Sequence, residues 1–272
     1  MNLIKIEFKK NFKSCLIWAI VLSSILFLYL AFFPSMRDAG FSELLDGKLD
    51  MMPEGLLDSL GLKDMPDFSV FMEYYCYVFQ FIAIGLVIYA MILGTKALSK
   101  EEGDKTIEFL YAKPVTRTQI VLSKMISSKA LILFVSLCLI VISIISDFIF
   151  GSGNTLMIIL VNAMMLIPVF VYWSIGFAIS SFLKDDSKSI TIALGLFFGS
   201  YLIGIIANTI EKLDFLKYLA PISYNPASAI FKFFNGQSGA ELNITALVLS
   251  AIIFVLGIII TFAKYSKKDL LN

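Results

Sequence analysis

Six long stretches that contain almost no charged residue constrain this fold more than any other feature of the chain. A helix needs about 20 apolar residues to cross a hydrocarbon core roughly 30 Å thick, because it rises about 1.5 Å per residue. Inside that core every backbone N–H and C=O must bond within the protein, which favours helices. The six stretches are 15–33, 74–93, 130–150, 156–183, 189–209 and 244–263. The sequence therefore predicts an all-α integral membrane protein with six transmembrane helices.

The composition removes several classes of function. Hydrophobic residues make up 58% of the chain and charged residues 16%, whereas an ordinary soluble domain carries about 25% charged residues. The net charge of +1 supplies no basic field, so we expect no nucleic-acid partner. The absence of histidine excludes histidine-based catalytic triads, and the three widely spaced cysteines match no metal-binding pattern. We therefore expect neither a catalytic group nor a metal site in this chain.

Lysine and arginine are distributed unequally between the two sides of the predicted membrane. Cytoplasmic loops of membrane proteins carry an excess of these residues. With six spans, both termini share one side with the loops after the second and fourth spans, and that side holds 16 of the 22 lysines and arginines. The sequence predicts a multi-pass protein of the cell (plasma) membrane with both termini in the cytoplasm.

The largest predicted cytoplasmic loop, residues 98–126, has the pattern of two helices joined by a turn. Ser99 and Glu102 match a capping box, in which two side chains bond free N–H groups at a helix start. Thr116 and Gln119 match a second box, and a proline separates the two patterns. We expect a short surface helix, a turn, and a helix that continues into the third span. A merely solvated loop that sets the topology is the alternative.

Residues 1–14 show an imperfect amphipathic pattern. Apolar side chains recur at every fourth position, and a lysine follows each of them. These residues are Ile4, Phe8 and Phe12 with Lys5, Lys9 and Lys13. The pattern predicts an amphipathic helix that lies in the cytoplasmic interface and then turns into the first span. Basic residues that only orient the first span are the alternative.

The predicted outer loop, residues 210–243, is unusually apolar for a connection. Its apolar segments are too short to span a membrane, and Pro221 and Pro226 interrupt them. Two short segments that dip into the outer leaflet fit this pattern, provided that protein or water surrounds their backbone. A partly buried outer cap fits it as well.

The fifth span carries a pair of glycines four residues apart, Gly195 and Gly199. Small residues at this spacing let two membrane helices approach closely. The pair is therefore a candidate face for a dimer contact.

The predicted cytoplasmic loop contains the spaced residues Glu102, Gly103, Thr106, Glu108, Pro114, Arg117 and Lys124. With these residues the loop resembles that of permease subunits of type-2 ATP-binding-cassette (ABC) exporters. In that family an acidic–Gly–x–x–Thr–x–Glu stretch is followed by Pro-x-x-Arg and a later lysine in the same loop. The six spans, the basic N-terminal segment and the apolar loop before the last span extend the resemblance over residues 1–272 as a single permease domain.

This resemblance implies that separate subunits form the substrate path and bind ATP. The chain would form the substrate path as a homo- or heterodimer in the lipid bilayer, with spans two and five along the path and the Pro221 region as an outer gate. The motif residues in the loop would form the coupling helix that contacts a separate cytoplasmic ATPase subunit. ATP and Mg²⁺ would bind that ATPase, and the chain itself contains no G-x-x-x-x-G-K-[ST] phosphate loop. The resemblance implies export of a drug, antibiotic, peptide or lipid-like substrate by a subunit that is not itself an enzyme.

Three other functions compete with this one. An ion-coupled carrier or channel would need no ATPase, but the spans lack acidic residues near the membrane midplane and show no evident inverted repeat. An intramembrane enzyme is disfavoured because no suitable catalytic residues occur in the spans. A membrane sensor or assembly factor with a permease architecture is the third alternative.

Overall fold

The computed structural model describes residues 3–38, 66–100, 116–151, 153–183, 187–237 and 239–267. These residues form helices and connecting turns, and no strand occurs among them. The α-helices are α1 (Leu3–Ala31), α2 (Phe33–Asp38), α5 (Phe71–Lys96), α8 (Arg117–Phe150), α9 (Thr155–Ser180), α10 (Ser189–Thr209), α11 (Ala227–Phe234) and α12 (Ile244–Lys267). Two 3₁₀-helices, η1 (Glu211–Leu219) and η2 (Pro221–Ser223), lie between α10 and α11.

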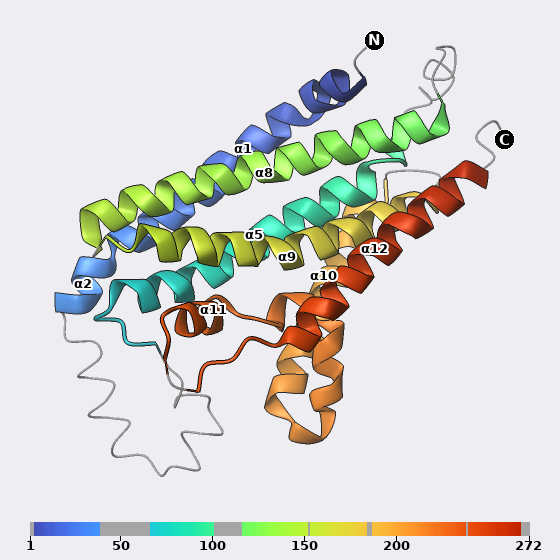
Figure 1. The fold of residues 1–272 in the computed structure, drawn as a ribbon. Coiled ribbons are helices and arrows are strands. Elements are labelled where there is room, and N and C mark those ends of the chain that lie inside the picture. The colour runs from blue at the N-terminus through green and yellow to red at the C-terminus, as the bar shows by residue number, and fades with distance from the viewer. Residues whose placement is uncertain are drawn as a thin grey trace.

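Six of these helices are long and apolar enough to cross a membrane, namely α1, α5, α8, α9, α10 and α12. Each contains one of the predicted spans or most of it, and α10 has the predicted bounds. The prediction of an all-α protein with six transmembrane helices is confirmed. Both ends of the chain lie at the same end of the bundle (Figure 1).

The first helix differs from the prediction in one respect. Residues 3–31 form the single uninterrupted helix α1, so no turn separates an interfacial helix from the first span. Phe8 and Phe12 stack at a ring-centroid distance of 5.3 Å, and Phe12 contacts Phe134 of α8 at 5.5 Å. The contact between Phe12 and Phe134 is made to a neighbouring membrane helix, which explains why the segment continues along α8 (Figure 1).

The capping box predicted at the start of α8 is present. The hydroxyl of Thr116 accepts the Gln119 N–H at 3.2 Å, and the Gln119 side chain accepts the Thr116 N–H at 3.1 Å. Two free N–H groups are thereby satisfied at the helix start. The helix then continues without interruption into the third span, as predicted.

The core of the bundle is a close contact between α5 and α9. A Cβ atom added to Gly94 of α5 would lie 2.5 Å from the carbonyl oxygen of Trp173, and one added to Gly176 of α9 would lie 2.7 Å from that of Met91. Glycine at both positions lets the two backbones touch. Gly257 of α12 makes a similar contact, because its Cβ would lie 2.8 Å from the Ser174 oxygen of α9. Helix α9 therefore packs closely on two sides.

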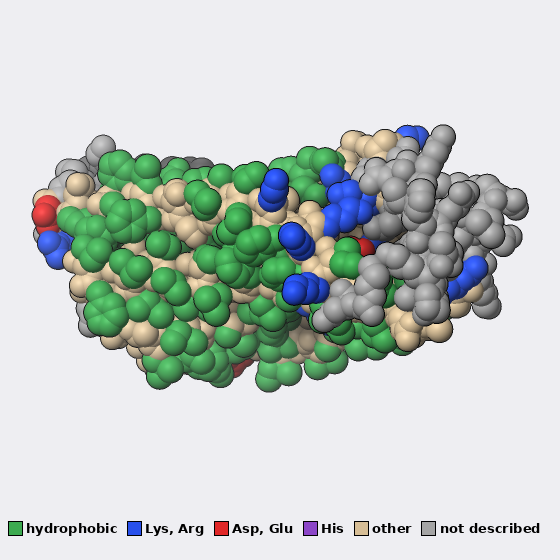
Figure 2. All heavy atoms as spheres, turned by 90° about the horizontal axis from the view of Figure 1, so that it is seen from above, with side chains coloured by type: hydrophobic (Ala, Val, Ile, Leu, Met, Phe, Trp, Pro, Cys, Tyr) green, Lys and Arg blue, Asp and Glu red, His purple; other side chains and the backbone are tan. Residues whose placement is uncertain are grey.

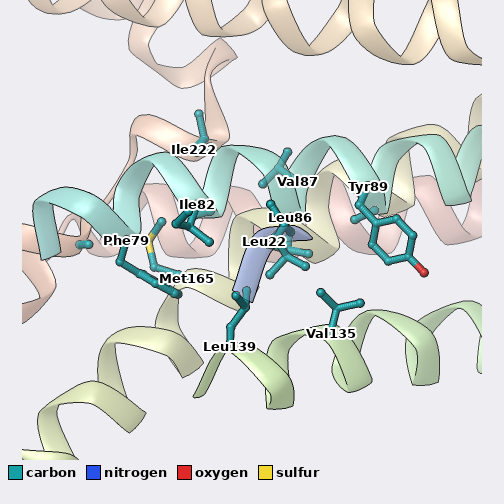
Figure 3. Packing of buried hydrophobic residues seen from close by; sticks show 14 of the residues in the cluster. Leu22, Phe79, Ile82, Leu86, Val87, Tyr89, Val135, Leu139, Met165 and Ile222 are labelled. Atoms are coloured by element: carbon teal, nitrogen blue, oxygen red, sulfur yellow. The ribbon is translucent and has the colours of Figure 1, made fainter. Parts of the chain in front are cut away.

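Helix α1 joins this core through apolar side chains. Leu22 lies among buried residues of α5 and α8, including Leu86, Val135 and Leu139 (Figure 3). Ile222 of η2 lies on the opposite side of α5 (Figure 3). The buried cluster thus reaches from the first helix to the segment that connects α10 with α12.

Much of the remaining surface is apolar. Only 22% of the most hydrophobic window of α10, and of α12, is buried, and large side chains such as Leu202 and Val255 are half exposed. On the face shown in Figure 2, hydrophobic side chains cover most of the described surface, and most of the basic groups lie from the middle of the view to its right. Such a surface is typical of helices that face lipid.

The α5–α9 contact generates a first prediction. We expect Gly94→Ala to lower the free energy of unfolding by about 1–3 kcal/mol, because the added methyl group meets backbone atoms that cannot rotate away. Gly195→Ala is the matched control, since no atom lies within 4 Å of a Cβ at that position. Thermal unfolding of both purified variants in one detergent measures the difference. An unchanged unfolding temperature for Gly94→Ala would show that the helices do not approach this closely.

Candidate functional site

The residues singled out in the cytoplasmic loop are only partly within the described structure. Glu102, Gly103, Thr106, Glu108 and Pro114 lie outside the described residues. The coupling helix therefore stays a prediction. Arg117 and Lys124, at the end of the motif, are both described and lie in the first turns of α8.

Arg117 connects the start of α8 to the end of α12. Its guanidinium Nη1 donates to the carbonyl oxygens of Ser266 at 2.9 Å and Tyr265 at 3.4 Å. The last carbonyls of a helix have no partner within the helix and attract a cation. Arg117 thus caps the C-terminal end of α12 with a charge of the favourable sign.

Lys124 connects α8 to α1. Its Nζ lies 3.3 Å from Glu7 Oε2, and the two side chains are only 4% and 13% exposed. A largely buried charge needs a partner of opposite sign. The sequence analysis did not select Glu7, although Glu7 is the only acidic residue before position 38. Its position as a single acidic residue among several lysines was the sequence feature that could have indicated an ion pair.

A cavity of about 220 Å³ lies between α1, α5 and α8 at this end of the bundle. Among the described residues, the charged side chains in its wall belong to four lysines and one glutamate, so the described wall is basic. They are Lys10, Lys96, Lys100, Lys124 and Glu7. Asn11, Ser14 and Ser128 add polar groups. Such a recess favours acidic side chains or other anions.

Two serines connect the C-terminal end of α5 to the start of α10. The hydroxyl of Ser189, the first residue of α10, donates to the carbonyl oxygen of Thr95 at 3.3 Å. The hydroxyl of Ser99 donates to the same oxygen at 3.0 Å and lies 3.3 Å from Ser189 Oγ. The end of α5 and the start of α10 are therefore held together. The cap between Ser99 and Glu102 stays a prediction.

The opposite end of the bundle contains the segment with Pro221 and Pro226. The side-chain oxygen of Gln80, nine residues after the start of α5, accepts the Ala227 N–H at 2.9 Å. That position is about 14 Å along the helix. Pro221 is buried, and Gly204 of α10 leaves room for Ala220 and Ser223. The connection thus returns between the helices to the depth of Gln80.

Two tyrosines fasten this returning segment. Tyr172 of α9 shares a hydrogen bond of 2.7 Å with Ser200 of α10 and also interacts with the backbone of Ile222. Tyr224 donates to the carbonyl oxygen of Tyr218. Burial raises the pKa of the Tyr224 hydroxyl to about 12, so it stays a neutral donor at physiological pH.

The two glycines predicted for a dimer contact make no close contact within the chain. No described atom lies within 4 Å of a Cβ at Gly195 or Gly199. Gly195 lies in the first half of α10 and Gly199 at its midpoint, whereas Gly204 in the second half contacts Ala220. The small face is therefore open in the described structure, and its use in a dimer stays a prediction.

A polar cluster lies inside the bundle toward the end opposite the termini. Tyr75 of α5 donates to Ser143 Oγ at 3.1 Å and accepts from Asn162 Nδ2 at 2.7 Å. Asp147 of α8 is 1% exposed, and its Oδ1 accepts the Gly153 N–H at 3.3 Å. These bonds join α5, α8 and α9, and polar pairs of this kind hold membrane helices together.

Comparison with known families identifies the chain. Residues 1–270 match the family described as ABC-2 family transporter protein. The chain belongs to this family. No curated protein and no solved structure matches the chain.

Membership of the ABC-2 family and six membrane-crossing helices make this chain a multi-pass membrane permease. Subunits of this kind are generally the non-catalytic membrane component of a transporter, and they typically work in a lipid bilayer with an ATPase subunit. The described residues contain no group of three metal-binding side chains of the His, Cys, Asp or Glu type.

The buried ion pair generates a second prediction. We expect Lys124→Met to lower the free energy of unfolding by about 3 kcal/mol, because Glu7 then keeps a charge in a largely buried position without its Lys124 partner. Glu7→Gln combined with Lys124→Met removes both charges and should recover most of that loss. Thermal unfolding of the two variants measures the recovery.

Lys9→Met is the matched control, because Lys9 is an exposed lysine of the same α1 segment and its loss should leave stability unchanged. If the double variant unfolds as readily as Lys124→Met alone, Glu7 and Lys124 do not act as a pair.

Proposed function

We propose that this ABC-2 permease is the membrane subunit of an ATP-driven exporter, that it works as a dimer, and that separate cytoplasmic ATPase subunits drive it. Membership of the family supports the proposal, and so does the apolar composition of the six spans. ATP and Mg²⁺ bind the ATPase partner, and this chain binds neither. Both termini and the loop 98–126 face the cytoplasm of the cell.

One observation carries the proposal, namely the linkage of three helices around the end of the loop. Arg117 binds the end of α12, and Lys124 pairs with Glu7 of α1, seven residues further along α8. Buried ion pairs and charged hydrogen bonds transmit a displacement because breaking them is costly. A push on the loop by an ATPase would therefore move the cytoplasmic ends of α1, α8 and α12 together.

The basic recess beside these residues suits the ATPase partner. Four lysines and one glutamate line the cavity between α1, α5 and α8. Basic surfaces select acidic surfaces and speed their encounter. We propose that the loop motif from Glu102 to Lys124 contacts an ATPase surface that carries acidic side chains next to this recess.

The substrate path runs between two copies of the chain, along α5 and α10. Helix α5 is largely buried within one copy, but Tyr77 and Phe81 remain 43% and 55% exposed on one face. The open glycine face of α10, at Gly195 and Gly199, leaves room for a second copy. The aromatic and uncharged character of these faces favours drugs, antibiotics, peptides or lipid-like molecules as substrates.

The segment from Pro221 to Pro226 forms the outer gate. Gln80 of α5 holds the backbone of Ala227, the residue that follows this segment, and Tyr172 of α9 interacts with the backbone of Ile222 within it. Export requires an inward-open and an outward-open packing of similar energy. A few hydrogen bonds between the gate and the spans allow the gate to move while the helices stay intact.

Recovery of the ATPase partner tests the proposal. A tagged chain is isolated gently from native membranes, and the recovered proteins are assayed for ATP hydrolysis. We expect a nucleotide-binding partner with the natural chain, and at least about tenfold less of it with Arg117→Ala or Glu108→Ala, because each substitution removes a charged contact. Lys188→Ala, at an exposed lysine of the loop before α10, is the control and should retain the partner.

Transport that follows an ion gradient in the absence of ATP would contradict the exporter and indicate an ion-coupled carrier. Full recovery of the ATPase with both loop variants would contradict the coupling role alone. Stimulation of the ATPase without movement of any substrate would indicate a sensor or assembly factor.

A further inference from the structure

A second cavity lies outside the proposed substrate path, on the side of the bundle formed by α8, α9 and α12. Its volume is about 480 Å³, and it opens onto the surface of the bundle. Apolar side chains form nearly all of its wall. The lining residues are Lys129, Met164, Ile167, Phe170, Val171, Leu247, Ser250, Ala251 and Phe254.

Away from Lys129, the cavity wall offers little to a water molecule. Ser250 is its only uncharged polar side chain, and its hydroxyl already donates to the carbonyl oxygen of Ala246 at 2.9 Å. A buried water molecule needs two to four polar partners. Hydrocarbon is therefore the filling that suits these walls.

Lys129 places a positive charge at one end of the cavity. It lies twelve residues after the start of α8, well inside the helix. Its Nζ lies 4.8 Å from the ring centroid of Phe254 and 5.0 Å from that of Trp173. No carboxylate forms a salt bridge with Lys129 in the described part of the chain. The two rings hold the ammonium group, and no described carboxylate neutralises its charge.

The cavity is elongated along the bundle. Its wall extends over eight residues of α9, from Met164 to Val171, and over eight residues of α12, from Leu247 to Phe254. Each stretch is about 10 Å long. Trp173 and Phe254 place Lys129 at the end of the cavity that is nearer to the C-terminal ends of both helices. The charge therefore lies toward the end of the bundle that holds both termini.

We propose that this cavity binds an anionic phospholipid, with its headgroup phosphate at Lys129 and one acyl chain along α9 and α12. A lysine with an apolar stem on an apolar wall presents its ammonium toward the membrane interface, where phosphate groups lie. The distribution of charge and apolar surface matches one leaflet of a bilayer: the charge lies nearer the interface, and the apolar part points to the midplane. The cationic end selects a net negative headgroup over a zwitterionic one.

The proposed site is independent of ATPase coupling and of the substrate path. It requires only that the chain lies in a membrane, and none of its lining residues belongs to the loop motif or the outer gate. A lipid held there fills the gap between α8, α9 and α12 and joins α8 to the two helices that carry the close contact at Gly257.

Lipid retention measured by native mass spectrometry tests the proposal. The full chain is purified in a mild detergent and mixed with equal amounts of two lipids that carry the same oleoyl chains, phosphatidylglycerol and phosphatidylcholine. We expect the natural chain to retain the anionic lipid in preference to the zwitterionic one. Lys129→Met should lower retention of phosphatidylglycerol about tenfold, since a charge-assisted hydrogen bond has roughly that effect on affinity. Lys129→Arg should keep the preference.

Matched controls separate the site from the general surface. Lys9→Met removes an exposed lysine of α1 and should leave retention unchanged. Ala251→Phe fills the cavity and should lower retention of both lipids, whereas Ile252→Phe, at an exposed neighbour outside the cavity wall, should not. Unfolding temperatures of all variants confirm that each is folded.

Three results would overturn the proposal. The first is equal retention of the two lipids by the natural chain, and the second is unchanged retention by folded Lys129→Met. The third is competition by glycerol phosphate, which has the phosphate but no acyl chain, at the same concentration as the lipid. That result would indicate a site for a soluble anion. None of these measurements involves the ATPase, so failure here leaves the exporter proposal intact.

Discussion

The close contact of α5 with α9 determines how the other helices can be arranged. Gly94 and Gly176 let the two backbones touch, and no rearrangement of side chains could replace that fit, because the atoms in contact are main-chain atoms. In a membrane the hydrophobic effect does not drive one apolar helix onto another, so close packing and polar contacts supply the attraction. Helix α12 makes a similar close contact with α9 through Gly257. Helix α1 packs its Leu22 side chain against Gly85 of α5. The order of helices around α9 and α5 follows from these few small residues.

In the described structure, the charged contacts that link one helix to another lie at one end of the bundle. Arg117, Lys124 and Glu7 hold three helix ends together where water and headgroups lower the cost of charge. At the other end the returning segment is held by neutral hydrogen bonds: the Ala227 N–H donates to Gln80, and Tyr224 donates to the carbonyl oxygen of Tyr218. Strong charged contacts at the end that holds the termini, and weaker contacts at the opposite end, fit the proposed function. In that function the first end receives the push from an ATPase and the opposite end opens.

The lengths of the apolar stretches and the distribution of charged residues predicted much of this fold. The six spans follow from counts of apolar residues, and the bounds of α10 match because charged or polar residues flank that stretch on both sides. The capping box at Thr116 was predictable because it is a local pattern of two residues. The continuity of α1 was not, since it depends on Phe12 meeting Phe134 of a distant helix. The pairing of Lys124 with Glu7 was missed for the same reason: the residues are far apart in sequence, and a motif shows which residues matter but not what they contact. The roles of Glu102 to Pro114 stay predictions.

Lys129 shows how depth changes the meaning of a residue. In the sequence, Lys129 is the last of seven basic residues between positions 96 and 129. Its position there indicates a loop residue that sets the topology. In the structure α8 begins twelve residues earlier, so the same lysine lies inside the helix between two aromatic rings. A charge that only set topology would gain nothing from that position, because the cost of a cation rises with depth in hydrocarbon. The aromatic faces offset part of that cost, and an apolar cavity of about 480 Å³ begins beside the ammonium group. A charge and a cavity that lie together at this depth are explained by one amphipathic anion, whose phosphate neutralises the lysine while its chain fills the space.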